Sequence, residues 1–304
     1  MTTTSKHQHL QADLLLLLTT LIAAAGWIFS KETLAGMQPL QFIALRFAGA
    51  GLVLACFCLL PLKQLTWPQF RAAAKVGCVF GLAMIFWILG LKHAQHLGVG
   101  AFLATLGIVM LPFLNRLFGG EAPPTFSYLA LPLVISGLAL LSLDPSFHLG
   151  WGEFSFMLAA FFLALMFLFN SQATARLAPL PLTSIQLLIT GLITGSISLL
   201  SEPLTLNSSP VIWGWFAASL LLATSLRFLL QTWAQSLAPP SHTAIIMTLE
   251  PVWTALAASL WFAETMTSYQ LLGCLLIFSA ILINRWPAFR QGWLQRKKAL
   301  EISD

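Results

Sequence analysis

The chain has 304 residues, of which 58% are hydrophobic and only 8% are charged. Soluble domains carry roughly 25% charged residues, so this composition excludes a soluble protein and predicts a polytopic membrane protein. The net charge of +5 does not indicate a nucleic-acid partner, because five of the fifteen basic residues form a juxtamembrane cluster in the C-terminal tail: Arg285, Arg290, Arg296, Lys297 and Lys298.

A helix needs about 20 apolar residues to cross a bilayer. Taken in chain order, the sequence predicts ten such helices, separated by short breaks rich in Pro, Gly, Ser and charge. The predicted spans are 12–30, 40–60, 72–91, 97–117, 126–143, 150–170, 181–200, 211–231, 240–262 and 268–286. These runs are too long and too continuously apolar for membrane strands, so the expected fold class is all-α.

The distribution of basic residues predicts the orientation, since cytoplasmic loops are enriched in Lys and Arg. With the N-terminus inside, eleven basic residues fall on the cytoplasmic side and two, Lys31 and Lys92, on the other. Ten spans return the C-terminus to the cytoplasm, so residues 1–11 and 287–304 are expected to be cytoplasmic tails. The expected location is the inner membrane of a bacterium.

An internal repeat divides the chain into two halves, 12–143 and 150–286. Residues 92–97 (KHAQHL) open a span much as residues 232–237 (TWAQSL) do in the second half. Both copies then continue into a helix of small residues that contains a proline. Because each half has an odd number of spans, the second must lie inverted relative to the first, as in many transporters.

An acid and a proline interrupt the ninth span at Glu250-Pro251. A charge in hydrocarbon costs at least a few kcal/mol, so Glu250 is expected to face a cavity or a partner. A proline is tolerated there only where the freed backbone groups are satisfied. A broken helix with an acid at this depth indicates a transporter. Glu250 is either a substrate or proton-coupling carboxylate, or a structural acid bonded to backbone freed at the kink.

The region after this kink continues with Val252, Glu264 and the segment Thr267–Gly273. Together with Glu250-Pro251, this pattern resembles the C-terminal half of the repeat in the drug/metabolite transporter superfamily, in particular the EamA-type transporters of ten helices. In the first half, Pro39-Leu40 and residues 44–47 (ALRF) are similar to the second helix of that repeat.

The resemblance covers about residues 12–286. It implies two inverted five-helix bundles around a central substrate cavity. The first half departs from the pattern, because Met110-Leu111-Pro112 has no acid where Glu250 stands in the second half. The two halves are therefore not expected to do equal work.

Three further polar residues are candidates for substrate contact. Arg46 lies within the second span and either holds an anionic or carbonyl group of a substrate or binds another helix or the interface. Arg227 is deeper and must point inward, either to pair with Glu250 or to contact substrate. His242 follows an interrupted stretch at the start of the ninth span, where the imidazole and free backbone could face substrate.

Two tryptophans and two amides complete the candidate site. Trp27 and Trp87 lie well within spans and suit a planar ligand by stacking, although helix packing is the alternative. Asn170 and Gln186 come from helices that the repeat places near the centre. Hydrogen bonding between helices would also explain these amides.

The expected function is secondary transport of a small organic metabolite by alternating access. Candidate cations outnumber the single clear mid-span acid, so the substrate is expected to be neutral, zwitterionic or anionic, with a planar vitamin such as riboflavin or an amino acid as leading examples. The alternatives are a passive facilitator or channel, or a membrane subunit of a larger assembly.

Enzymatic function is not expected. The sequence has no phosphate-binding loop, no metal-binding motif and no nucleophile beside a base, so no catalytic residue, cofactor or metal is predicted. The expected partners are the solute, the lipid bilayer and a coupling ion such as the proton, without nucleic acid. Monomer and homodimer both remain open.

Overall fold

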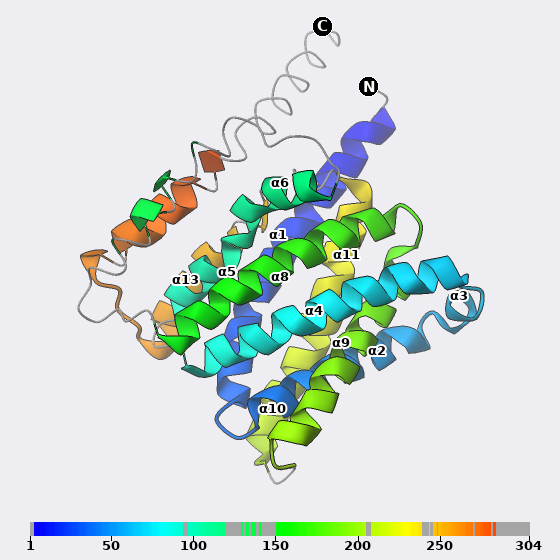
Figure 1. The fold of residues 1–304 in the computed structure, drawn as a ribbon, viewed down its shortest axis with the longest axis horizontal. Helices are drawn as coiled ribbons and strands as arrows, with labels where there is room; N and C mark the ends of the chain where they lie inside the picture. Colours follow the sequence, from blue (N-terminus) through cyan, green and yellow to red (C-terminus); the bar gives the residue numbers. More distant parts are fainter. Residues whose placement is uncertain are drawn as a thin grey trace, which may run out of the picture.

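The protein is described by a computed structural model, in which the chain is helical with no strand in any described residue. This confirms the all-α class. Figure 1 shows the long helices gathered into one bundle. The structure describes residues 3–93, 97–118, 150–204, 208–238, 249–269 and 271–280, with short pieces between 129 and 140, at 243, at 246–247 and at 282–283.

The named elements follow one another with short connections where both ends are described. In chain order they are α1 Thr3–Thr33, α2 Pro39–Cys56, α3 Leu59–Lys63, α4 Trp67–His93, α5 Leu97–Thr105, α6 Gly107–Leu117, α8 Trp151–Thr174, α9 Pro179–Ser201, α10 Pro210–Leu220, the π-helical η1 Leu221–Leu226, α11 Arg227–Leu237 and α13 Leu249–Phe262.

Within the described residues, six helices are long and apolar enough to cross a bilayer. The span expected over 126–143 and the start of the one expected over 240–262 lie mostly outside these residues, and Leu271–Ala280 is a shorter apolar helix. The ten-span count and the inversion therefore stay predictions. The six long helices are Gln11–Thr33, Pro39–Cys56, Trp67–His93, Trp151–Thr174, Pro179–Ser201 and Pro210–Leu237.

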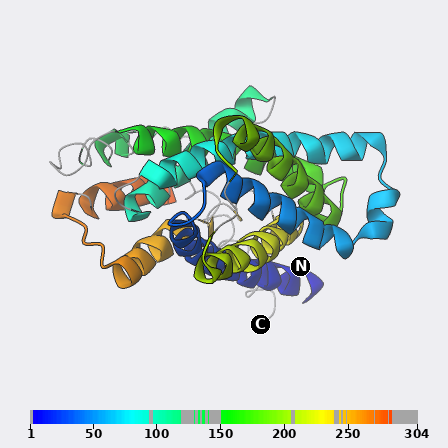
Figure 2. The same ribbon diagram turned by 90° about the horizontal axis from the view of Figure 1, so that it is seen from below.

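Small residues let α2 and α9 approach until their backbones touch. A Cβ on Gly191 would lie 2.3 Å from the backbone nitrogen of Ala48, so only glycine fits there. Ser184 Oγ donates to the carbonyl oxygen of Gly51 across the same interface, at 3.0 Å. Figures 1 and 2 show the two helices side by side, with α4 covering α8 and α9. Close packing of this kind is how helices associate without a hydrophobic driving force in lipid.

The start of α2 is tied to the end of α9. Pro39 occupies the first turn, where its missing N–H has no intrahelical partner to lose. The next two N–H groups, of Leu40 and Gln41, donate to the carboxylate of Glu202 at 3.1 and 2.9 Å. This anion at a helix N-terminus fixes one end of the α2–α9 pair.

The single span expected over 97–117 is instead two helices, with a break at Leu106 between α5 and α6. The N–H of Leu106 turns back to the carbonyl of Leu103, at 3.1 Å, rather than one residue further. A Cβ on Gly107 would lie 2.3 Å from the carbonyl oxygen of Ala160. Pro112 has no N–H to donate to a carbonyl of the preceding turn. The break therefore accompanies a close approach to α8 that a regular helix with side chains would not allow.

The span expected over 211–231 runs from Pro210 to Leu237 as one helix with a π-helical turn at Leu221–Leu226. In this wider turn, side-chain hydroxyls donate to backbone carbonyls five residues earlier in the chain. Thr224 Oγ1 donates to Ser219 at 2.8 Å, and Ser225 Oγ donates to Leu220 at 2.9 Å. Such insertions are frequent at functional sites.

Candidate substrate site

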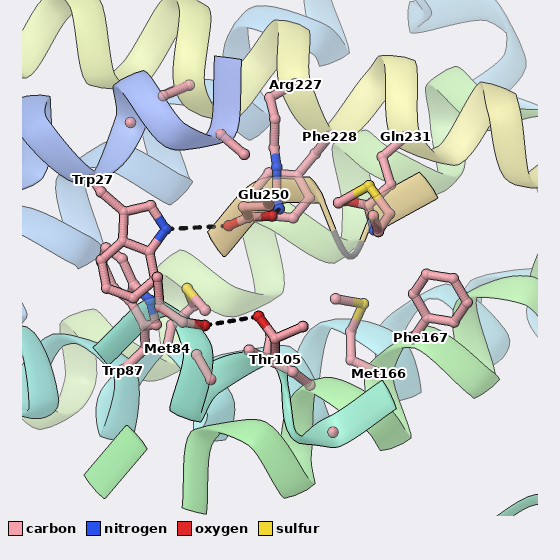
Figure 3. Close-up of a pocket in the computed structure, with 18 of the residues that line it drawn as sticks. Trp27, Met84, Trp87, Thr105, Met166, Phe167, Arg227, Phe228, Gln231 and Glu250 are labelled. Atoms are coloured by element: carbon pink, nitrogen blue, oxygen red, sulfur yellow. Dashed lines mark hydrogen bonds and ion pairs between the residues drawn. The ribbon is translucent and has the colours of Figure 1, made fainter. Parts of the chain in front are cut away.

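A cavity of about 150 Å³, partly open to the outside, lies between the helices. Figure 3 shows Arg227 and Gln231 reaching into it from α11, opposite Thr105 and Met166. Its lining residues are Ala23, Gly26, Trp27, Arg46, Phe47, Met84, Trp87, Ala101, Ala104, Thr105, Gly107, Leu111, Leu163, Ala164, Met166, Phe167, Ala223, Arg227, Phe228, Gln231, Met247 and Glu250.

The carboxylate of Glu250 joins three helices at the edge of this cavity. Its Oε1 accepts a hydrogen bond from Trp27 Nε1 of α1 at 3.1 Å, and its Oε2 pairs with Arg227 Nη2 of α11 at 3.0 Å. Thr254 Oγ1 donates to the backbone carbonyl of Glu250, one turn on in α13, at 2.9 Å. Among the described residues, the carboxylate is therefore bonded to side chains of two neighbouring helices.

Arg227 forms the ion pair that the sequence offered as one of two roles. Its side chain is 15% exposed and that of Glu250 is 19% exposed, and both residues line the cavity. The guanidinium also lies over the ring of Phe228, 4.3 Å from its centre. Ion pair and ring together hold the guanidinium plane in a fixed orientation.

Arg46 lines the cavity, but its guanidinium nitrogens form hydrogen bonds to groups on other helices. Its Nη1 donates to Ser30 Oγ of α1 at 2.9 Å, its Nη2 to the carbonyl of Ala223 at 3.2 Å, and its Nε to Thr224 Oγ1. The last two acceptors belong to the π-helical turn. The guanidinium therefore joins α1, α2 and η1, while its positive charge remains at the cavity wall.

The two predicted tryptophans are together in the cavity wall. Trp27 and Trp87 meet edge to face with their ring centres 4.9 Å apart, and the ring centre of Phe156 lies 5.5 Å from that of Trp27. The bond from Trp27 to Glu250 fixes the orientation of the indole. The pair thus forms a packed aromatic wall, with helix packing and exposure to the cavity combined.

The structure places the two predicted amides away from the cavity lining. Asn170 lies between α8 and α11, where its Nδ2 donates to Gln235 Oε1 and, at 3.5 Å, to Thr232 Oγ1. Gln186 is buried on the face of α9 that meets Gly77 of α4. Neither amide is among the residues that line the cavity in the described structure. His242 lies outside the described residues.

A sequence model of the EamA-like transporter family matches residues 10–143 and again residues 150–286. The chain belongs to the EamA-like transporter family. The resemblance to the drug/metabolite transporter superfamily is thereby confirmed. Both matched segments of this EamA-like chain line the cavity, the first through α1, α2, α4, α5 and α6 and the second through α8, η1, α11 and α13.

This EamA-like chain is similar to two archaeal proteins and to a protein of solved structure. Two proteins of Archaeoglobus fulgidus, each called an uncharacterized transporter, are 26% identical over 284 residues and 27% identical over 205 residues. The first alignment covers 91% of this chain and 86% of the relative, and the second covers 67% and 73%. A solved crystal structure superposes with a TM-score of 0.66 at 17% identity, covering 90% of this chain and 96% of that one, and this likeness shows the fold alone.

Sequence reasoning missed Gln231, which lines the cavity one helical turn after Arg227. The signal was available: Arg227, Gln231 and Gln235 recur every four residues in an apolar span, and that spacing places polar groups on one helix face. The missed π-helical turn just before Arg227 has no comparable signal in composition.

The site can bind and orient a solute. Among the lining residues that the structure describes, the ionisable groups are two guanidiniums, of Arg46 and Arg227, and the single carboxylate of Glu250. No group of three His, Cys, Asp or Glu side chains that could hold a metal occurs within the described parts of the chain. Most of the remaining wall is apolar or aromatic, as in sites for organic molecules.

Proposed function

We propose that this EamA-like chain is a secondary transporter that moves a small organic solute by alternating access, with the cavity as the substrate site. The observation that carries the proposal is that both family-matched segments contribute to one cavity containing an ion pair and an aromatic wall. A site at the interface of two repeats is where such transporters bind their substrates.

The proposed architecture is a pair of inverted repeats, 12–143 and 150–286, flanked by the tails 1–11 and 287–304. Counting spans from the start of each half makes α1 equivalent to α8, α2 to α9, α4 to α10–α11, and α5 to α13. The packing supports this: α2 contacts its equivalent α9, and α5 contacts its equivalent α13. The α4–α8 contact likewise corresponds to the contact of α10–α11 with α1. A pseudo-twofold axis that relates the two halves requires each contact between helices to have such a counterpart.

The proposed setting is a bacterial inner membrane with both termini in the cytoplasm. Lys63, Arg71 and Arg176 gather at one end of the bundle, where Gln69 Nε2 donates to the carbonyl of Arg176 at 3.0 Å. Lys31 lies at the opposite end of α1 and α2. This separation agrees with the greater number of basic residues expected on the cytoplasmic side.

The proposed substrate is neutral, zwitterionic or anionic. Two guanidiniums against one carboxylate give the described lining a formal charge of one positive, which disfavours a cationic solute. The aromatic wall favours a solute with an apolar or planar part. A vitamin such as riboflavin and the amino acids remain examples to be tested.

The test is uptake by purified protein in proteoliposomes, with a panel of vitamins, amino acids and organic acids. We expect saturable uptake and exchange of at least one panel member, and stronger accumulation when a proton or sodium gradient is applied. Saturable uptake that ignores every ion gradient would identify a passive facilitator. Absence of transport for every neutral and anionic solute, with transport of organic cations, would contradict the proposal.

A further inference from the structure

The cavity face of α11 carries polar atoms that have no partner among the described residues. Arg227 uses Nη2 for Glu250, but its buried Nε has no hydrogen-bond acceptor. Gln231 is 3% exposed and lines the cavity, yet its Oε1 has no donor. Buried polar atoms are nearly always bonded, so these two point to a group that enters the cavity.

The unpartnered N–H of Arg227 and the unpartnered carbonyl of Gln231 belong to side chains on the same face of α11. Arg227 and Gln231 are four residues apart on one helix, and side chains at that spacing lie on the same face. Figure 3 shows both extending from α11 toward the cavity interior. The pair therefore places a guanidinium N–H and an amide on the face of α11 that lines the cavity.

The charge around this pair favours an anion. Glu250 balances Arg227, whereas the partners of Arg46 are the hydroxyls of Ser30 and Thr224 and one backbone carbonyl. One positive charge at the described wall is thus left without a carboxylate. An entering acid would restore balance and accept from Arg227 Nε.

We propose that Arg227 and Gln231 form a two-point site for an organic anion with an O–H or N–H donor next to its acidic group. The acid accepts from Arg227, the adjacent donor bonds Gln231 Oε1, and an aromatic or apolar body lies against Trp87 and Phe167. This inference rests on the proposed function and names the substrate class for the same cavity. Gln231 is then the residue that determines specificity for the donor.

Desolvation makes the discrimination substantial. An acid with the donor pairs the buried Gln231 carbonyl, whereas an analogue without it leaves that carbonyl unpaired, a difference of about 1–3 kcal/mol, or roughly 5- to 150-fold in affinity. Replacing Gln231 by methionine removes the polar group from both complexes. The affinity of the analogue is then expected to approach that of the acid with the donor.

The test uses phenyllactate and phenylpropionate, which have the same ring and charge and differ by one hydroxyl. Binding to purified protein in lipid nanodiscs is measured by calorimetry. We expect the native protein to prefer phenyllactate by about tenfold or more, and Gln231→Met to reduce this preference to within about twofold. If Gln231→Met does not fold, Gln231→Asn tests the same bond with a shorter amide.

Gln186→Met is the matched control, because Gln186 is also a buried amide with an unpartnered Oε1 but does not line the cavity. It is expected to keep the full preference for phenyllactate. A preference that persists in Gln231→Met, an equal loss in Gln186→Met, or no binding of either acid to the native protein would each overturn the inference. Transport of some other solute by the same preparation would leave the proposed function standing in all three cases.

Discussion

At the residue scale, Glu250 is the point where α1, α11 and α13 meet. Both carboxylate oxygens are occupied, one by Trp27 and one by Arg227. A carboxylate held in this way stabilises the arrangement of three helices that surround one side of the cavity. Charge-assisted bonds of this kind are stronger than bonds between neutral groups.

We expect Glu250→Gln to lower the Tm of the purified protein. The amide oxygen can still accept from Trp27, but Arg227 is left with an unbalanced charge in a site that is only 15% exposed, at a cost of about 1–3 kcal/mol. The double variant Glu250→Gln with Arg227→Met should recover part of the loss, because it removes that charge. Additive Tm changes would show that the two side chains do not interact.

Trp27→Phe should also reduce stability, by about 1 kcal/mol, because the ring is kept while the bond to Glu250 is lost. Trp87→Phe is the control, since Trp87 makes ring contacts with Trp27 but no hydrogen bond with any described residue. Thermal unfolding in detergent compares the two. Equal effects would mean that the Trp27–Glu250 bond contributes nothing beyond ring packing.

Arg46→Lys separates the structural role of Arg46 from its charge. An ammonium keeps the positive charge but cannot reach Ser30, Thr224 and the Ala223 carbonyl together. We expect a clearly lower Tm with anion affinity changed by less than about threefold. A loss of affinity of more than tenfold at unchanged Tm would instead make Arg46 a direct substrate ligand.

The sequence predicts those site residues whose chemistry is conspicuous in a membrane span. Glu250, Arg227, Arg46, Trp27 and Trp87 stand out because charges are costly in lipid and aromatic rings are large, and all five line the cavity. Sequence position alone does not distinguish these five residues from amides in the spans that bond other helices. Which face of a helix meets the cavity depends on packing between distant segments.

At the element scale, the α2–α9 contact depends on glycine. Gly191→Ala would place a Cβ 2.3 Å from the backbone of Ala48, so the helices must move apart. We expect a loss of about 1–3 kcal/mol, seen as a lower Tm. Gly214→Ala in α10 is the control, because a Cβ there meets nothing within 4 Å and alanine is expected to be neutral or stabilising by up to about 1 kcal/mol. A Tm unchanged by Gly191→Ala would contradict the close contact.

Length and apolar content predict that helices exist, but not how regular they are. The break at Leu106 follows from the approach of Gly107 to Ala160, and the π-helical turn at Leu221–Leu226 supplies acceptors for Arg46. Both irregularities depend on a residue far away in the sequence. The local pattern of apolar residues, with a period of 3.6, therefore predicts regular helices at these two places.

At the scale of the whole molecule, we expect one cavity that opens in turn to the two sides of the membrane. In the described structure, helices from both matched segments enclose that cavity. The repeat and the cavity together make motion of one half against the other the expected mechanism. Residue contacts such as Trp27–Glu250 would then be made and broken as the halves move.

The most direct measurement is the accessibility of a single cysteine at Ala104, a small residue in the cavity wall, after replacement of Cys56, Cys58, Cys78 and Cys274. A membrane-impermeant thiol reagent is applied to right-side-out and to inverted vesicles. Alternating access predicts labelling in both preparations, with a transported solute protecting the cysteine in each. Labelling from one side only, whatever solute or ion gradient is supplied, would contradict it.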